Sequence, residues 1–185
     1  HDTPYSSALV TKTLIDNYGY VEAYSFWTFS DIFEEHGQVP GEFRGGFGLQ
    51  TIHGIPKPVY RAFELMHQLG EERLPKVEEQ GHVGICPIVD KEGSLAILVY
   101  NQEMIGKSVS EEKVEIHIKN APGKKAEIQR IDDNHANAKK QWEEMGCPTY
   151  PTPAQVKELK EASELKTEEL PVKVEGEEAV LEFAL

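Results

Sequence analysis

Residues 24–35 read YSFWTFSDIFEE, an apolar and aromatic-dense run that ends abruptly in polar and acidic residues. Half of the chain's aromatic residues lie between positions 20 and 47, and a glycine-rich segment, 41–48, closes this region. A strand buried on both faces reads as continuous apolar sequence, and ligand sites in parallel sheets gather at the carboxyl ends of the strands. The pattern therefore predicts a strand over Val21–Phe29 and a ligand face where Ser30 and Asp31 begin.

The residue types at this strand end suit a sugar. Aromatic faces stack on the apolar faces of pyranose rings, and carboxylates accept directional hydrogen bonds from neighbouring hydroxyls. Aromatic residues at this density also fill protein cores. The pattern alone leaves a sugar site and a purely structural strand open.

Several segments resemble, in the same order, the C-terminal part of family 39 glycoside hydrolases, in particular the bacterial β-xylosidases. They are residues 1–5 (HDTPY), 24–35, 43–49 (FRGGFGL), 54–58 (GIPKP), 134–137 (NHAN), Trp142, Met145 and Gly146, and 151–153 (PTP). The resemblance covers nearly the whole chain.

The resemblance implies a retaining mechanism with two carboxylates about 5–5.5 Å apart, one the nucleophile and one the acid/base. In that family the acid/base Glu lies in an Asn-Glu-Pro type motif, and the nucleophile shortly precedes the segment similar to residues 1–4. This chain contains no Asn-Glu-Pro. We therefore expect both catalytic glutamates upstream of His1, no catalytic residue here, and no need for a metal or an organic cofactor.

The resemblance also implies substrate-binding residues. Trp27 matches a sugar-platform tryptophan, and Glu34 and Glu35 match acidic residues that hold substrate hydroxyls. Phe47 would wall the pocket and His1 would line the cleft. Each has a plainer explanation: a core tryptophan, solvated carboxylates, a tight glycine turn around Phe47, and an uncertain position for His1 at the chain end.

The expected fold class is α+β. A helix capped by Thr3, with Pro4 at its first position, has an apolar face formed by Ala8, Leu9, Leu14 and Ile15. A second helix begins at Pro58 and stops at Gly70. By resemblance, residues 1–72 are the last helix–strand–helix units of a (β/α)8 barrel.

The sequence pattern of residues 73–185 predicts an antiparallel β-sandwich. Strands are expected over Val83–Val89, Leu95–Tyr100, 114–118 and 126–130, the last two forming a meander around a turn at 121–123. Thr152 and Gln155 have capping-box spacing for a short helix through Ser163 on the polar surface. The final run, 179–185, reads as a strand cut off in mid-course, so we expect an excerpt of a longer protein.

Composition excludes several function classes. A net charge of −13 argues against nucleic acid binding. The sequence contains no apolar run of 18 residues, so it predicts no membrane-spanning helix. The seven histidines lack the spacing of a metal site. Cys86 and Cys147 are expected to be free thiols, consistent with a cytoplasmic location. The sequence leaves open whether the chain forms a homo-oligomer.

The favoured interpretation is a fragment, inactive alone, of a retaining β-xylosidase that releases terminal xylose from xylo-oligosaccharides. A family 39 enzyme for another sugar, such as α-L-iduronidase, is one alternative. A non-catalytic carbohydrate-binding or interaction module is the other, since fold does not fix function.

Overall fold

The computed structural model describes residues 1–33, 37–70, 72–75, 81–121, 123 and 125–185. The chain divides into two compact units, each formed from two separate stretches of sequence. The first unit comprises residues 1–67 and 130–166, and the second comprises residues 68–129 and 167–185. The sequence-based division at 72/73 instead placed residues 130–166 in the second domain.

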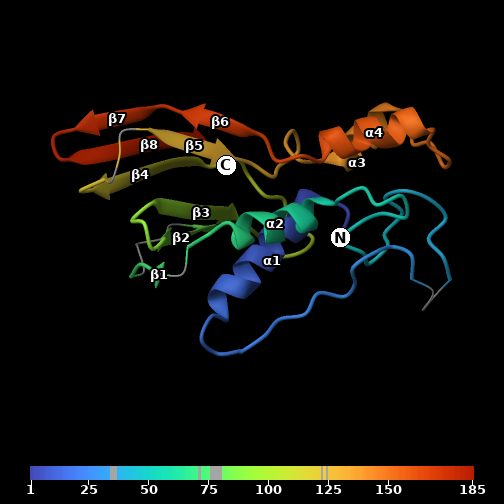
Figure 1. Cartoon of the computed structure of the whole chain (residues 1–185), viewed down its shortest axis with the longest axis horizontal. Coiled ribbons are helices and arrows are strands. Elements are labelled where there is room, and N and C mark those ends of the chain that lie inside the picture. Colours follow the sequence, from blue (N-terminus) through green and yellow to red (C-terminus); the bar gives the residue numbers. More distant parts are fainter. Residues whose placement is uncertain (34–36, 71, 76–80, 122, 124) are drawn as a thin grey trace. The chain divides into compact units, whose positions relative to one another are not determined.

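The described helices belong to the first unit and the described strands to the second (Figure 1). The helices are α1 Pro4–Asp16, α2 Pro58–His67, α3 Ala138–Glu144 and α4 Pro153–Ala162. The strands are β1 Glu72–Arg73, β2 Val83–Val89, β3 Leu95–Asn101, β4 Lys113–Lys119, β5 Ala126–Gln129, β6 Thr167–Leu170, β7 Val172–Glu175 and β8 Glu178–Ala184.

Helix α1 begins as predicted, with Thr3 at the N-cap and Pro4 in the first turn. The predicted apolar face is only partly covered, since Ala8, Leu14 and Ile15 are half-buried and none of the four residues is fully buried. The buried side chains of α1 are Ser6, Ser7 and Thr11, and Leu9 is 42% exposed. A buried hydroxyl costs little when it is hydrogen-bonded. Ser6 Oγ donates to the Thr3 carbonyl at 2.8 Å, whereas the buried Ser7 Oγ has no hydrogen-bond partner among the described residues.

The predicted strand over Val21–Phe29 is wrong. This segment forms only isolated bridges at its ends, and Tyr24 and Phe29 are more than half exposed. A central strand needs hydrogen-bonding partners on both sides. Apart from the bridge of Val21 to Tyr18, the backbone pairing described around this segment joins residues 28–31 to residues 47–50. The Thr28 amide donates to the Phe47 carbonyl at 2.9 Å, and the Leu49 amide donates to the Thr28 carbonyl at 2.8 Å.

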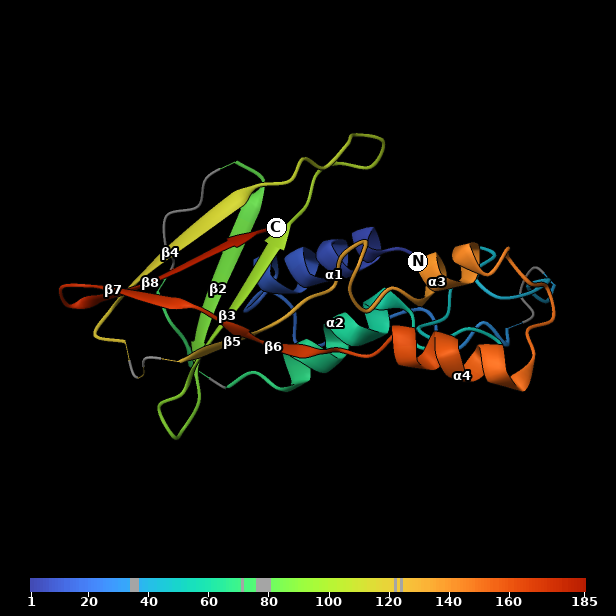
Figure 2. The ribbon, with the colours of Figure 1, turned by 90° about the horizontal axis from the view of Figure 1, so that it is seen from above.

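The core of the first unit explains why residues 130–166 join it. Five buried residues from both stretches pack together: Phe43, Ile55, Ala138, Trp142 and Leu159. Helix α4 has the predicted capping box at Thr152 and Gln155. It does not lie wholly on the polar surface, however, because Leu159 is fully buried in this core. Figure 2 shows helices α1, α2, α3 and α4 of this unit from above.

The second unit is built of antiparallel sheets with strand orders β1-β2-β3, β4-β8-β7 and β5-β6. The strands predicted at Val83–Val89 and Leu95–Tyr100 are confirmed as β2 and β3. The meander is wrong, because β4 pairs with the C-terminal β8 and β5 pairs with β6. One apolar cluster joins residues of the three sheets, including Ile97, Ile116 and Ile128, as in a β-sandwich.

His117 on β4 provides a test of surface electrostatics in this unit. Its Nε2 lies 2.5 Å from Glu115 Oε1 and its Nδ1 lies 3.2 Å from Glu178 Oε2. The hydrogen bonds to Glu115 and then Glu178 raise the pKa of His117 above its ordinary value. Lys119 Nζ lies 3.7 Å from the other carboxylate oxygen of Glu178.

A raised folded pKa means that protonated His117 stabilises the fold. The contribution is fully present below the ordinary imidazole pKa and is lost as the pH rises through the raised value. We expect His117→Gln to lower the unfolding midpoint at about pH 6 but to have little effect at about pH 9. Thermal unfolding of both proteins across this range checks it. An equal difference at both pH values would contradict the assignment.

Candidate functional site

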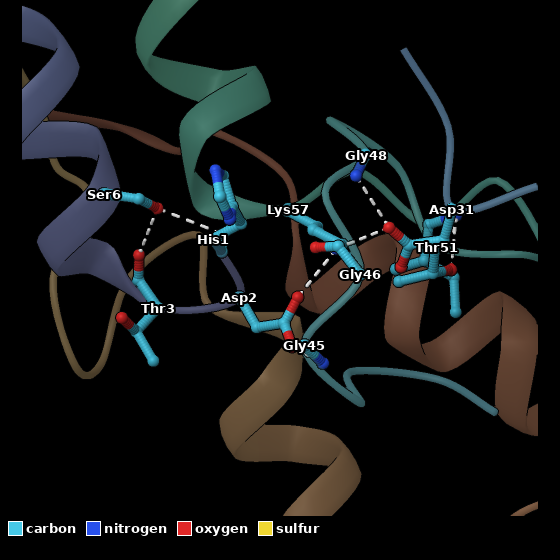
Figure 3. A network of polar contacts seen from close by, with 11 residues as sticks. His1, Asp2, Thr3, Ser6, Asp31, Gly45, Gly46, Gly48, Thr51 and Lys57 are labelled. Atoms are coloured by element: carbon cyan, nitrogen blue, oxygen red, sulfur yellow. Dashed lines mark hydrogen bonds and ion pairs between the residues drawn. The ribbon is translucent and has the colours of Figure 1, made fainter. Parts of the chain in front are cut away.

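A buried lysine connects three separate segments of the first unit. Lys57 immediately precedes α2, and its side chain is fully buried. Its Nζ donates to Asp31 Oδ1 at 2.8 Å and to the Gly46 carbonyl at 2.9 Å, and it forms an ion pair with Asp2 Oδ1 at 2.7 Å (Figure 3). An ammonium has three donors, so three oxygens from three segments surround it.

The two carboxylates are also held by the backbone of the glycine-rich segment. The Gly48 amide donates to Asp31 Oδ1 at 2.7 Å, and the Gly45 amide donates to Asp2 Oδ2 at 2.8 Å. Burial raises the pKa of Asp31 above its usual range, and the hydrogen bond from Lys57 opposes that shift. The cluster thus contains one ammonium group and two carboxyl groups.

The glycines of this segment are required by the close approach to Asp31. A Cβ added to Gly46 would lie 2.3 Å from Asp31 Oδ1, and a Cβ added to Gly48 would lie 2.3 Å from the Asp31 amide nitrogen. Gly45 has a φ of +83°, a conformation that other residues rarely adopt. The Gly45-Gly46-Phe47-Gly48 sequence therefore reflects contact with a carboxylate, in addition to a turn.

Aromatic rings lie next to this cluster. The His1 ring meets the edges of Phe26 and Phe47, with ring centroids 5.4 and 5.7 Å apart. Trp27 packs edge-on against Phe33 at 5.4 Å. Trp27 is 63% exposed and Phe47 is 40% exposed. Exposed aromatic faces of this kind are available to stack on a ligand.

A pocket of about 190 Å³ opens between the aromatic segment and the glycine-rich segment. Its lining consists of Asp31, Phe33, Gly37, Val39, Gly45, Gly46 and Phe47. Phe33 is the ring against which Trp27 packs. Apolar and aromatic walls with a few fixed polar groups are typical of small-molecule sites.

The structure brings some of the predicted substrate-binding residues together. His1 and Phe47 are in ring contact, and Trp27 lies on the segment whose continuation, 28–31, pairs with 47–50. Glu34 and Glu35 lie outside the described residues, so their role stays a prediction. Their neighbour Phe33 lines the pocket.

The sequence analysis missed the Lys57 cluster. Lysine before a helix is usually a surface residue, and nothing in the pattern linked Lys57 to Asp2 or Asp31. The signal was indirect. Asp31 ends an apolar run, Lys57 stands between Pro56 and Pro58, and all of these positions lie in segments that carry the family resemblance.

The described residues offer neither a metal-binding cluster nor a membrane-spanning helix. They contain no group of three or more His, Cys, Asp or Glu side chains that could hold a metal ion. The buried Glu42 contacts His53 Nδ1, but this is a pair without a third ligand. No described helix is long and apolar enough to cross a membrane. Cys86 and Cys147 are free, as predicted.

The chain belongs to glycosyl hydrolases family 39, whose family model matches residues 1–179. Two curated relatives are β-xylosidases. The protein of Caldicellulosiruptor saccharolyticus is 40% identical over 173 residues, which are 92% of this chain and 36% of the relative. The protein of Geobacillus stearothermophilus is 33% identical over 163 residues, 88% of this chain and 31% of the relative. The chain thus spans about a third of the length of these relatives.

Two solved structures have a fold similar to that of this chain. A family 39 β-xylosidase from Caulobacter crescentus matches with a TM-score of 0.70 and 26% identity, covering 98% of this chain and 40% of that protein. A bacterial orthologue of human α-L-iduronidase matches with a TM-score of 0.54 and 23% identity over 71% of this chain and 25% of that protein. The mixed helices and antiparallel sheets of this chain match the fold of these neighbours.

Proposed function

We propose that this chain is the C-terminal part of a retaining β-xylosidase that releases terminal xylose from xylo-oligosaccharides. The observation that carries the proposal is the 40% identity, over 92% of the chain, to a protein named β-xylosidase. Because the chain spans only about a third of that relative and contains no Asn-Glu-Pro, we assign both catalytic glutamates to the part of the protein outside it.

In this proposal the chain contributes to substrate binding. Retaining enzymes act by two inverting displacements through a glycosyl-enzyme intermediate, which requires the sugar to be held between two carboxylates. Trp27 would stack on the sugar, and Phe47 and His1 would form a wall of the same pocket. Glu34 and Glu35 would accept hydrogen bonds from the sugar hydroxyls.

We also propose that residues 1–72 are the last units of a (β/α)8 barrel and that the later strands form the accessory sandwich. Two observations support this. Residues 28–31 pair with 47–50 through a parallel bridge between Ser30 and Gln50. The adjoining segment, which forms no strand in this structure, exposes Tyr20, Tyr24, Trp27 and Phe29, as expected for a segment whose pairing partners belong to the part of the barrel outside this chain.

The alternatives have weaker support. The α-L-iduronidase orthologue is 23% identical, a level at which likeness concerns the fold alone. A free-standing carbohydrate-binding module would not need the helices and strand-like segment of residues 1–67. The coding sequence upstream of His1 distinguishes a module from a barrel enzyme. A cytoplasmic location, suggested by the two free cysteines, is tested by whether that upstream sequence encodes a signal peptide.

The full-length protein tests the function directly. We expect it to hydrolyse an aryl β-D-xyloside and to release β-xylose first, because a retaining mechanism preserves the anomeric configuration. Proton NMR of the reaction resolves the first anomer formed. An aryl α-L-iduronide is the matched control and should be left intact. Release of α-xylose first, or hydrolysis of the iduronide alone, would contradict the proposal.

A further inference from the structure

We propose that Lys57 is a positioning residue for the sugar site: together with Asp2 and Asp31, it fixes the relative positions of the three segments that carry His1, Trp27 and Phe47. The inference rests on the proposed function, because it takes the aromatic pocket to be the place where the sugar binds.

Each partner of Lys57 lies close in sequence to one expected sugar contact. Asp2 directly follows His1, and Gly46 directly precedes Phe47. Asp31 ends the segment that begins at Trp27, and this segment pairs with residues 47–50. Three segments that are far apart in sequence therefore meet at one ammonium group, which Figure 3 shows between the carboxylates of Asp2 and Asp31.

The cluster and the pocket share a wall. Asp31, Gly45 and Gly46 line the pocket beside Phe47, and they also form or adjoin the shell around Lys57 Nζ. Gly46 and Asp31 are packed in direct contact, since even a methyl group at Gly46 would overlap Asp31 Oδ1. A shift of Asp31 or Gly46 after loss of Lys57 would therefore change the shape of the pocket.

Stability alone is a poor explanation for this cluster. Buried ion pairs lose about as much in desolvation as they gain in attraction, and apolar replacements of similar volume are often equally stable. Here two carboxylates share one ammonium, and Asp31 Oδ2 has no hydrogen-bond partner among the described residues. What the cluster provides is a fixed geometry, which binding sites need to within about 0.5 Å.

The test compares variants of the full-length protein. Lys57→Met keeps the length of the side chain and removes its charge and donors, and Asp2→Asn is a milder change to the same cluster. For Lys57→Met we expect kcat/KM for an aryl β-D-xyloside to fall about 10- to 100-fold, as misplacement by an ångström can cause. The inhibition constant for D-xylose should rise by a similar factor, while kcat changes less. Asp2→Asn should shift both in the same direction by a smaller factor.

Leu159→Ala is the matched structural control, because Leu159 is fully buried in the same unit but lies in the core formed with Trp142. It should lower the unfolding temperature and leave KM and the D-xylose inhibition constant within about twofold of the wild type. This difference separates positioning from general destabilisation.

A folded Lys57→Met variant with wild-type KM and D-xylose inhibition would overturn the inference. If Lys57→Met does not fold, an unchanged D-xylose inhibition constant in Asp2→Asn would overturn it instead. These results would leave the proposed function intact, since the wild type would still hydrolyse the xyloside. A wild-type protein without xylosidase activity would contradict the proposed function first and this inference with it.

Discussion

The purified 185-residue chain should show no hydrolysis of an aryl β-D-xyloside above the rate in buffer. A retaining glycosidase needs a nucleophile and an acid/base on opposite sides of the scissile bond, and we assign both to the part of the protein outside this chain. Enzymes accelerate such reactions at least about a millionfold, so a chain with no catalytic pair is expected at background. Release of the aryl alcohol, followed spectrophotometrically, measures this.

Two controls make the result interpretable. The full-length protein at the same molar concentration should be active, which excludes faulty substrate or buffer. Circular dichroism should show that the isolated chain retains helices and strands. Xyloside hydrolysis by the chain, surviving removal of contaminating enzyme by a second purification, would show that a catalytic pair lies within these residues and would remove the basis for assigning it elsewhere.

Local sequence signals predicted local structure well. The capping box at Thr152 and Gln155, the helix start at Pro58 and the strands β2 and β3 are all found where the sequence places them. Each depends on contacts within a few residues or with the next strand along the chain. Pairing with distant strands was not predictable in this way: β4 pairs with β8, which begins almost 60 residues after β4 ends.

Errors arose where the structure depends on distant partners. The strand predicted over Val21–Phe29 and the apolar face of α1 both assume neighbours on several sides. The apolar pattern of each segment is real, but the side chains of Tyr24, Phe29 and Leu9 are exposed in this chain. An apolar pattern indicates that one face of a segment is buried in the complete protein, but it does not identify the elements that bury it.

The candidate site shows the same limit. The aromatic run followed by acidic residues does border a pocket, since Asp31 and Phe33 line it and His1 contacts Phe47, but sugar binding there stays a prediction. The residue that links these segments, Lys57, was not found, since burial of a lysine depends on two carboxylates that come from distant positions. Tertiary charge pairing has no periodic signature in a sequence.

Trp27→Ala in the full-length protein should lower kcat/KM for an aryl β-D-xyloside by roughly 10- to 1,000-fold, equivalent to about 1.4–4 kcal/mol of transition-state stabilisation. Trp27 is 63% exposed and contacts Phe33, which lines the pocket. If the ring keeps this exposure at the ligand end of the complete barrel, as the proposed function requires, its truncation removes a face for the sugar and creates no core cavity. We therefore expect a large loss of activity with little change in the unfolding temperature.

Trp142, the other tryptophan of this chain, is the matched control. It is 4% exposed, packs in the core with Phe43 and Leu159, and its Nε1 donates to the Pro148 carbonyl at 3.0 Å. Trp142→Ala should cost about 3–5 kcal/mol of stability and leave kcat/KM of the molecules that remain folded unchanged. Thermal unfolding and steady-state kinetics on the same samples separate the two effects. If Trp27→Ala instead lowers stability and spares kcat/KM, the ring is structural in the complete protein and the sugar site must be sought elsewhere.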